Sequence, residues 1–170
     1  MRQETGDRDF VPWVAPIAAR LRESRQEVAR LAGDFPESAW EDLSEVPGWT
    51  YRGILAHLAE GDVFVQMVLR AVIEDSDTDL RLQSSVRETR TAGIIARGRE
   101  RSIGELIGDI QREGEETQTL LAWLLSEHES VSVITSNRNP TPVSAGDFLR
   151  AFRHDEEHIA HLRRAVEVRS

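Results

Sequence analysis

The 170-residue sequence has no cysteine, no lysine, few aromatic residues and no long apolar run. Without cysteine the chain forms no disulfide, binds no metal through thiolate and has no cysteine nucleophile. No segment approaches the roughly 20 apolar residues of a membrane span, and the polar N-terminus lacks the apolar centre of a signal peptide. We therefore expect a cytoplasmic protein of bacterial type that does not bind membranes.

All basic residues are arginine, and the 21 arginines are outnumbered by 30 acidic residues, which gives a formal net charge of −9. An acidic chain without a basic run is a poor partner for a phosphate backbone. The aromatic residues are not interleaved with arginine, as they are in surfaces that stack nucleic-acid bases. We predict no nucleic-acid partner. The length predicts one domain over residues 1–170, with residues 1–10 frayed.

The spacing of apolar residues predicts four amphipathic helices, at about residues 16–32, 50–75, 102–126 and 144–168. Thr50, Ser102 and Ser144 are suited to cap the last three, and Glu105 completes a capping box with Ser102. Shorter helical pieces are expected around residues 38–43 and 91–99. The apolar alternation at residues 131–134 is compatible with a strand, but no partner strand is evident. These features predict an all-α four-helix bundle with long crossover connections.

Histidines carry the clearest chemical signal. His154 and His158 are four residues apart, so a helix places both on one face, where two imidazoles can reach one metal ion. His161 follows at the seventh position, whereas His128 lies in a polar loop and is expected at the surface. The alternative is that the C-terminal histidines form a solvated strip among acidic residues. Asp155 projects towards the apolar face, where it needs an imidazole or an arginine as partner.

His57 lies at the edge of the apolar stripe of the second predicted helix. Gly53 and Gly61 flank it, one helical turn away on either side. Because glycine costs about 1 kcal/mol against alanine inside a helix, two glycines here need a reason. They either leave open volume above the imidazole or allow close helix packing. If the second and fourth helices are neighbours, His57 can join His154 and His158 around one cation, leaving coordination positions open for a reactive ligand.

Three short motifs, in this order and separation, resemble the DinB/YfiT-like superfamily. They are Gly48-Trp49-Thr50, the run from Ile54 to Leu58 that includes Ala56-His57, and His154-Asp155-Glu156-Glu157-His158-Ile159. The resemblance covers nearly the whole chain. It implies a four-helix bundle in which a divalent transition metal (Zn, Ni or Fe) is bound by His57, His154 and His158. His161 does not match a usual ligand position.

The resemblance implies several activities, because such proteins include a mycothiol-dependent maleylpyruvate isomerase, thiol transferases and metal-dependent hydrolases. Our first hypothesis is a metal-dependent enzyme acting on a small molecule, either a thiol S-transferase or a related detoxification enzyme. Since the chain has no cysteine, the thiol would be a separate low-molecular-weight compound. The alternatives are a metal-dependent hydrolase, a non-catalytic bundle that sequesters a small molecule, and a structural bundle without metal.

The roles of three further charged residues stay open at this level. Glu60, one turn after His57, is either a general base or solvated. Arg52 and Arg153 either recognise an acidic thiol cofactor or lie at the surface. Bundles of this kind also pair through exposed apolar helix faces, so a homodimer is compatible with the sequence.

Overall fold

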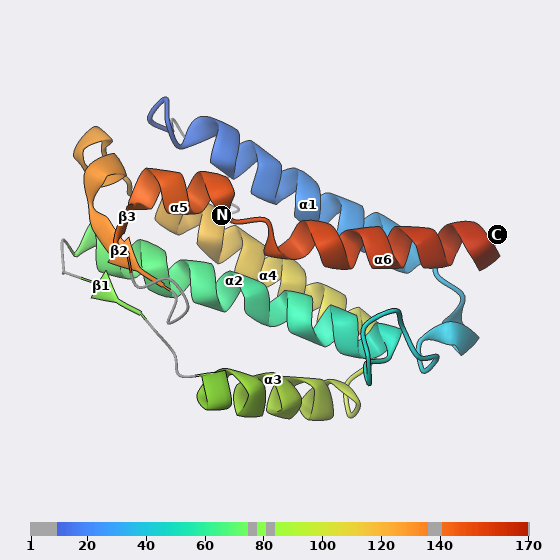
Figure 1. Cartoon of the computed structure of the whole chain (residues 1–170). Coiled ribbons are helices and arrows are strands. Elements are labelled where there is room, and N and C mark those ends of the chain that lie inside the picture. The colour runs from blue at the N-terminus through green and yellow to red at the C-terminus, as the bar shows by residue number, and fades with distance from the viewer. Residues whose placement is uncertain (1–9, 75–77, 81–83, 136–140, 170) are drawn as a thin grey trace, which may run out of the picture.

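The structure is a computed structural model that describes residues 10–74, 78–80, 84–135 and 141–169. These residues form six α-helices: α1 Ala15–Asp34, α2 Tyr51–Ile73, α3 Ser84–Gly98, α4 Ile103–Leu121, α5 Ala145–Ala151 and α6 His154–Arg169. Two 3-10 turns, η1 Glu37–Ala39 and η2 Ser126–Ser130, lie in the connections. Helices α1, α2, α4 and the α5–α6 pair form a four-helix bundle, and α3 lies outside it beside α2 (Figure 1). Most of the predicted 1–10 segment falls outside the described residues.

Helices α2, α4 and α5 begin where the polar caps predict. The Thr50 hydroxyl accepts a hydrogen bond from Gly53 N, and the Ser144 hydroxyl accepts one from Asp147 N. Ser102 and Glu105 form the predicted reciprocal capping box at the start of α4. Each cap satisfies amide groups that the first helical turn leaves without partners. The α3 helix is longer than the piece predicted at residues 91–99.

The prediction of one continuous helix over residues 144–168 is wrong, because the chain leaves the helical conformation at Phe152 (φ −67°, ψ 109°). The Arg20 guanidinium of α1 donates to the carbonyl oxygens of Leu149, Arg150 and Phe152, at 2.7, 2.9 and 3.1 Å. These bonds satisfy carbonyls that end a helix without intrahelical partners. The break allows a new helix, α6, to begin at His154.

The apolar alternation near residues 131–134 is a strand with partners, which corrects the expectation that it had none. Strand β2, Ser132–Ile134, pairs in parallel with β1, Thr78–Asp79, and antiparallel with β3, Val143–Ser144. Both partners are only two residues long, which is too short for a period-2 pattern to be recognised in the sequence.

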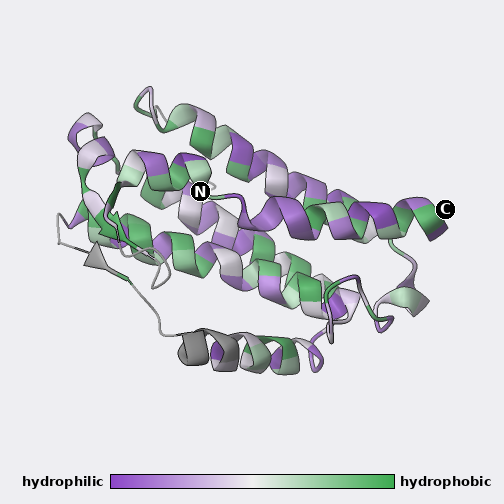
Figure 2. Cartoon of the chain, viewed as in Figure 1, coloured by the Kyte–Doolittle hydropathy of each residue, from purple (hydrophilic) through white to green (hydrophobic). Residues whose placement is uncertain are grey.

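The bundle core consists of two apolar clusters. One cluster is formed by side chains from the C-terminal half of α1, the N-terminal half of α2 and most of α6. The other is formed by side chains from the opposite halves of α1 and α2 together with α5. Figure 2 shows polar and apolar residues alternating around these helices. Between the clusters lie the buried polar residues, which are Arg25, Asp62, Gln66, Thr117 and Asp155. None of the helices among the described residues is long and apolar enough to cross a membrane.

Candidate metal centre

Three histidines from two helices meet at one end of this polar layer. His57 lies on α2, and His154 and His158 lie on the first two turns of α6. One ring nitrogen from each lies within 4.8 Å of the other two, and His57 Nε2 is 2.7 Å from His154 Nε2. The three side chains that the sequence singled out are therefore brought together. Their role as metal ligands stays a prediction.

The two glycines that flank His57 have different functions. A Cβ atom at Gly61 would lie 3.2 Å from His154 Nδ1 and 3.3 Å from Asp155 Oδ1, so glycine lets the start of α6 approach α2. A Cβ atom at Gly53 would instead lie 3.3 Å from the Ile95 side chain of α3. Of the two alternatives left open by the sequence, both glycines therefore support close helix packing, of α6 on α2 at Gly61 and of α3 on α2 at Gly53.

Two of the imidazoles are neutral at neutral pH. Burial, together with the neighbouring imidazoles His154 and His158, lowers the pKa of His57 to about 3. Burial and the neighbouring imidazoles also lower the pKa of His158 to about 4. A neutral imidazole offers the lone pair that a metal ion requires.

Asp155 joins the histidines to a buried arginine. It is only 4% exposed; its Oδ1 lies 3.3 Å from His154 Nδ1, and its Oδ2 accepts a 2.6 Å hydrogen bond from Arg25 Nη1. The sequence predicted an imidazole or an arginine as its partner, and it has both. Burial raises the pKa of Asp155, but hydrogen bonds with His154 and Arg25 outweigh it and lower the pKa to about 2. The carboxylate therefore favours the His154 tautomer with Nδ1 protonated and the Nε2 lone pair directed towards His57.

A buried polar network continues from Arg25 across the bundle. Arg25 Nε donates to Asp62 Oδ2 at 2.6 Å, and the Thr117 hydroxyl donates to Asp62 Oδ1 at 3.2 Å. Burial favours the uncharged form of Arg25, but the hydrogen bonds and charges of Asp62 and Asp155 outweigh it and raise its pKa. Arginine with two carboxylates thus ties α1 to α2 and α6 beneath the histidines.

Sequence analysis did not identify Arg25 and Asp62 as part of the site. A signal was present, because each interrupts an apolar stripe at a position that should face the core. Arg25 stands between Leu21 and Val28 on α1, and Asp62 stands between Leu58 and Val65 on α2. A charged residue on a buried stripe needs a charged partner on a neighbouring helix.

Aromatic rings flank the histidines on two sides. The Trp49 indole lies 4.8 Å from the His57 ring and 5.8 Å from the His158 ring, nearly parallel to the latter. The Phe152 ring lies 5.9 Å from the His154 ring at an interplanar angle of 21°. The His154 side chain remains 31% exposed, so the group is open to solvent on its side.

The other histidines lie outside this group. His161 Nε2 is 3.6 Å from Glu45 Oε2, and its ring is 6.1 Å from that of His158. The His128 ring accepts a hydrogen bond from Leu125 N at 3.0 Å, so it caps η2.

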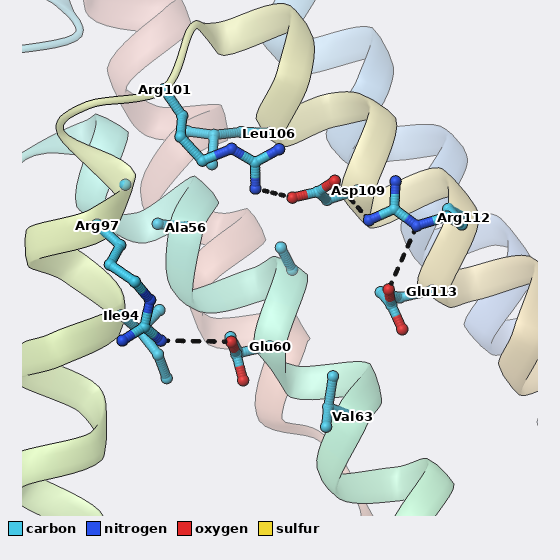
Figure 3. A pocket seen from close by; sticks show the side chains of 12 residues that line it. Ala56, Glu60, Val63, Ile94, Arg97, Arg101, Leu106, Asp109, Arg112 and Glu113 are labelled. Atoms are coloured by element: carbon cyan, nitrogen blue, oxygen red, sulfur yellow. Dashed lines mark hydrogen bonds and ion pairs between the residues drawn. The ribbon is translucent and has the colours of Figure 1, made fainter.

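The charged residues whose roles were open are occupied elsewhere. Glu60 pairs with Arg90 and Arg97 of α3, at 3.2 and 3.8 Å, on the side of α2 seen in Figure 3. Arg52 pairs with Glu41 at 2.5 Å, and Arg153 pairs with Glu156 at 3.0 Å. The structure does not bring any of the three to the histidines.

The three histidines fit a divalent transition metal. Imidazole nitrogen is a ligand of Zn, Ni and Fe, and three such ligands leave coordination positions open. His57 Nδ1 and His158 Nδ1 are buried without a hydrogen-bond partner, as is His161 Nδ1 outside the group, and such a condition often marks a bound ion or water. The Nε2 atoms of His57 and His154, 2.7 Å apart, are at hydrogen-bond distance, so one of them carries a proton, and a bound cation would take the place of that proton.

Comparisons with known proteins agree on fold and family. The profile of the family described as mycothiol maleylpyruvate isomerase N-terminal domain matches residues 21–163. YfiT from Bacillus subtilis, described as a probable metal-dependent hydrolase with an unusual four-helix bundle topology, superposes with a TM-score of 0.76 at 12% identity. That likeness covers 99% of this chain and 94% of YfiT.

A mycothiol-dependent maleylpyruvate isomerase superposes with a TM-score of 0.69 at 14% identity, covering 90% of this chain. The chain spans 60% of the isomerase's length. No curated protein sequence matches. At these identities the likenesses show the fold, which is the predicted DinB/YfiT-like four-helix bundle.

Proposed function

Because the chain belongs to the family of mycothiol maleylpyruvate isomerase N-terminal domains, within the DinB/YfiT-like superfamily, we propose that it is a metal-dependent enzyme. His57, His154 and His158 hold one divalent transition metal, and residues 1–170 act as one domain. The substrate is a small molecule, and the reaction is the transfer of a low-molecular-weight thiol. The convergence of three imidazole nitrogens within 4.8 Å carries this proposal.

The chain's own residues bind and orient the reacting groups. A divalent metal held by three imidazoles lowers the pKa of a bound thiol or water and so supplies a nucleophile near neutral pH. Asp155 holds the His154 ring in one orientation, and Trp49 and Phe152 cover the flanks of the histidines. The exposed edge of His154 is the side from which a substrate approaches.

Two observations support a thiol as the nucleophile. The family takes its name from a mycothiol-dependent isomerase, and the chain has no cysteine that could supply a thiol itself. Hydrolysis is the second candidate. It is supported by the likeness to YfiT, which covers 99% of this chain and is described as a probable metal-dependent hydrolase.

Metal content and turnover test the proposal. Protein purified without a histidine tag is expected to contain about one divalent metal per chain. His57→Ala should lose that metal, whereas His128→Ala, which removes a histidine outside the group, should retain it. Metal-loaded enzyme is then assayed with mycothiol and 1-chloro-2,4-dinitrobenzene, in which the thiol sulfur displaces chloride, and with p-nitrophenyl acetate.

Metal-dependent consumption of the thiol supports transfer, and metal-dependent ester cleavage without thiol supports hydrolysis. If wild-type protein binds no metal, or if His57→Ala binds it equally well, the proposal is wrong. If metal binds but neither reaction occurs, the chain is a binding protein instead.

A further inference from the structure

A second feature of the molecule lies beside the histidines but does not include them. A pocket of about 490 Å³ separates the turn at residues 47–49 from one face of α3. Trp49 and Ile95 supply its large apolar side chains, and Thr91, Ala92 and Ala96 leave the α3 side open. This volume is within the range of about 300–1,000 Å³ that small-molecule sites occupy.

Both walls of the pocket are held in place. Trp49 N donates to Val46 O at 3.0 Å, and Trp49 O accepts from Ser44 N at 2.8 Å, so the indole stands on a fixed backbone. Gly48 has φ +79°, a left-handed conformation that favours glycine in this turn. On the other side, Gly53 lies against Ile95, which packs α3 closely on α2. A preformed pocket avoids part of the ordering cost of binding.

The pocket carries one arginine without an ion-pair partner. Among the residues that the structure describes, Arg99 makes no ion pair, and it is exposed at the pocket. The pocket of about 290 Å³ on the far side of α3 is different, because its arginines already face acids (Figure 3). There, Arg97 pairs with Glu60, and Arg101 and Arg112 pair with Asp109. Of these two pockets, the larger therefore offers an arginine that makes no ion pair with the described residues and is free to bind an acidic group.

The pocket shares a wall with the candidate metal centre. The same Trp49 indole that lines it lies 4.8 Å from the His57 ring and 5.8 Å from the His158 ring. Trp49 is therefore common to the pocket and to the surroundings of the histidines.

We propose that this pocket binds a small organic acid whose apolar body packs on Trp49 and Ile95 and whose carboxylate or sulfonate pairs with Arg99. Apolar contact supplies the affinity, and the charge-assisted hydrogen bond fixes the orientation. The pocket is built without the metal, so this inference stands apart from the proposed function. If both hold, acids of this kind are the compounds presented to the metal centre.

Isothermal titration of metal-free protein with matched probes tests the inference. 4-Phenylbutyrate has both the apolar body and the acid, 4-phenylbutanol lacks the acid, and butyrate lacks most of the body. Wild-type protein should bind 4-phenylbutyrate about tenfold tighter than 4-phenylbutanol, as expected for one charge-assisted hydrogen bond, and should not bind butyrate measurably.

Arg99→Gln should abolish the preference for the acid while 4-phenylbutanol still binds. Arg97→Gln, on the same helix but facing the other pocket, should retain the preference. Ala96→Trp fills the larger pocket and should abolish binding of both probes, with circular dichroism confirming that the helices persist. The inference is overturned if wild-type protein does not bind 4-phenylbutyrate, if Arg99→Gln keeps the tenfold preference, or if Arg97→Gln loses it.

Discussion

Replacing Asp155 by asparagine separates the buried network's effect on stability from its effect on metal binding. The substitution keeps the side-chain shape but removes the charge that faces both His154 Nδ1, at 3.3 Å, and Arg25 Nη1, at 2.6 Å. Asp62→Asn is the matched control. It removes the other carboxylate that pairs with Arg25, at 2.6 Å, and no hydrogen bond joins Asp62 to a histidine among the described residues.

The expected stability losses are alike. Removing one partner of a buried ion pair costs about 3–5 kcal/mol. In either variant Arg25 retains one carboxylate, so we expect a loss of about 3 kcal/mol, at the lower end of that range. Chemical denaturation of metal-free protein measures this loss.

The expected metal affinities differ. A partner that orients a ligating histidine contributes about 10- to 100-fold in affinity. Since the Asp155–His154 contact is long for a hydrogen bond, we expect Asp155→Asn to weaken binding by about tenfold. Asp62→Asn should leave the affinity within about twofold of wild type. Competition with a zinc chelator measures the metal affinity of each variant. Equal weakening in the two variants would refute the reasoning, because the loss of affinity would then come from the general loss of stability.

Three further predictions follow from individual contacts. Gly61→Ala should weaken metal binding, because its Cβ would lie 3.2 Å from His154 Nδ1. The control is Gly108→Ala, whose Cβ meets nothing within 4 Å; it should raise stability by about 1 kcal/mol without changing the metal affinity. Equal metal affinities of wild type and Gly61→Ala, measured by competition with a chelator, would contradict this prediction. Arg20→Met should destabilise the chain by about 2 kcal/mol, because the carbonyls at the end of α5 lose their donor. The denaturation midpoint measures this loss, with exposed Arg22→Met as the control. An unchanged midpoint would show that the break between α5 and α6 does not depend on Arg20. Hydrogen bonding from Arg30 and then Arg163 lowers the pKa of Glu27 from 4.5 to about 2, so its contribution is present above pH 4.5 and is lost as the pH falls towards 2. The Tm of wild-type protein should therefore exceed that of Glu27→Gln at pH 7 but not near pH 2, with Glu23→Gln as the control. A Tm difference that stays constant across this pH range would argue against the ion pair.

The sequence predicted the bundle because apolar periodicity and serine or threonine caps are local signals, which Thr50 and Ser102 illustrate. It also predicted which three histidines meet, through the helical spacing of His154 and His158, the position of His57 at the edge of an apolar stripe, and the resemblance that implies the same three residues. The break after Ala151 was not predictable locally, because it depends on Arg20, about 130 residues earlier in the chain. Strands β1 and β3 were not predictable locally either, because two residues are too few to show the alternating pattern of a strand.

The buried network illustrates what sequence reasoning can recover and what it cannot. The position of Asp155 on an apolar face indicated that it needed a partner, but the identity of that partner depends on how α1 packs against α6. Arg25 and Asp62 are ordinary charged residues until the tertiary structure shows that they are buried. Trp49 was visible in a motif, yet its contacts with two imidazoles and its place in a pocket follow only from the turn that precedes α2.

The most direct test of the metal centre is a crystal structure of tag-free protein grown with zinc and measured at the zinc absorption edge. We expect one anomalous peak, with a ring nitrogen of each of His57, His154 and His158 at about 2.0–2.1 Å. A structure without a peak between these rings, or with zinc bound by His161 in place of one of them, would contradict the account.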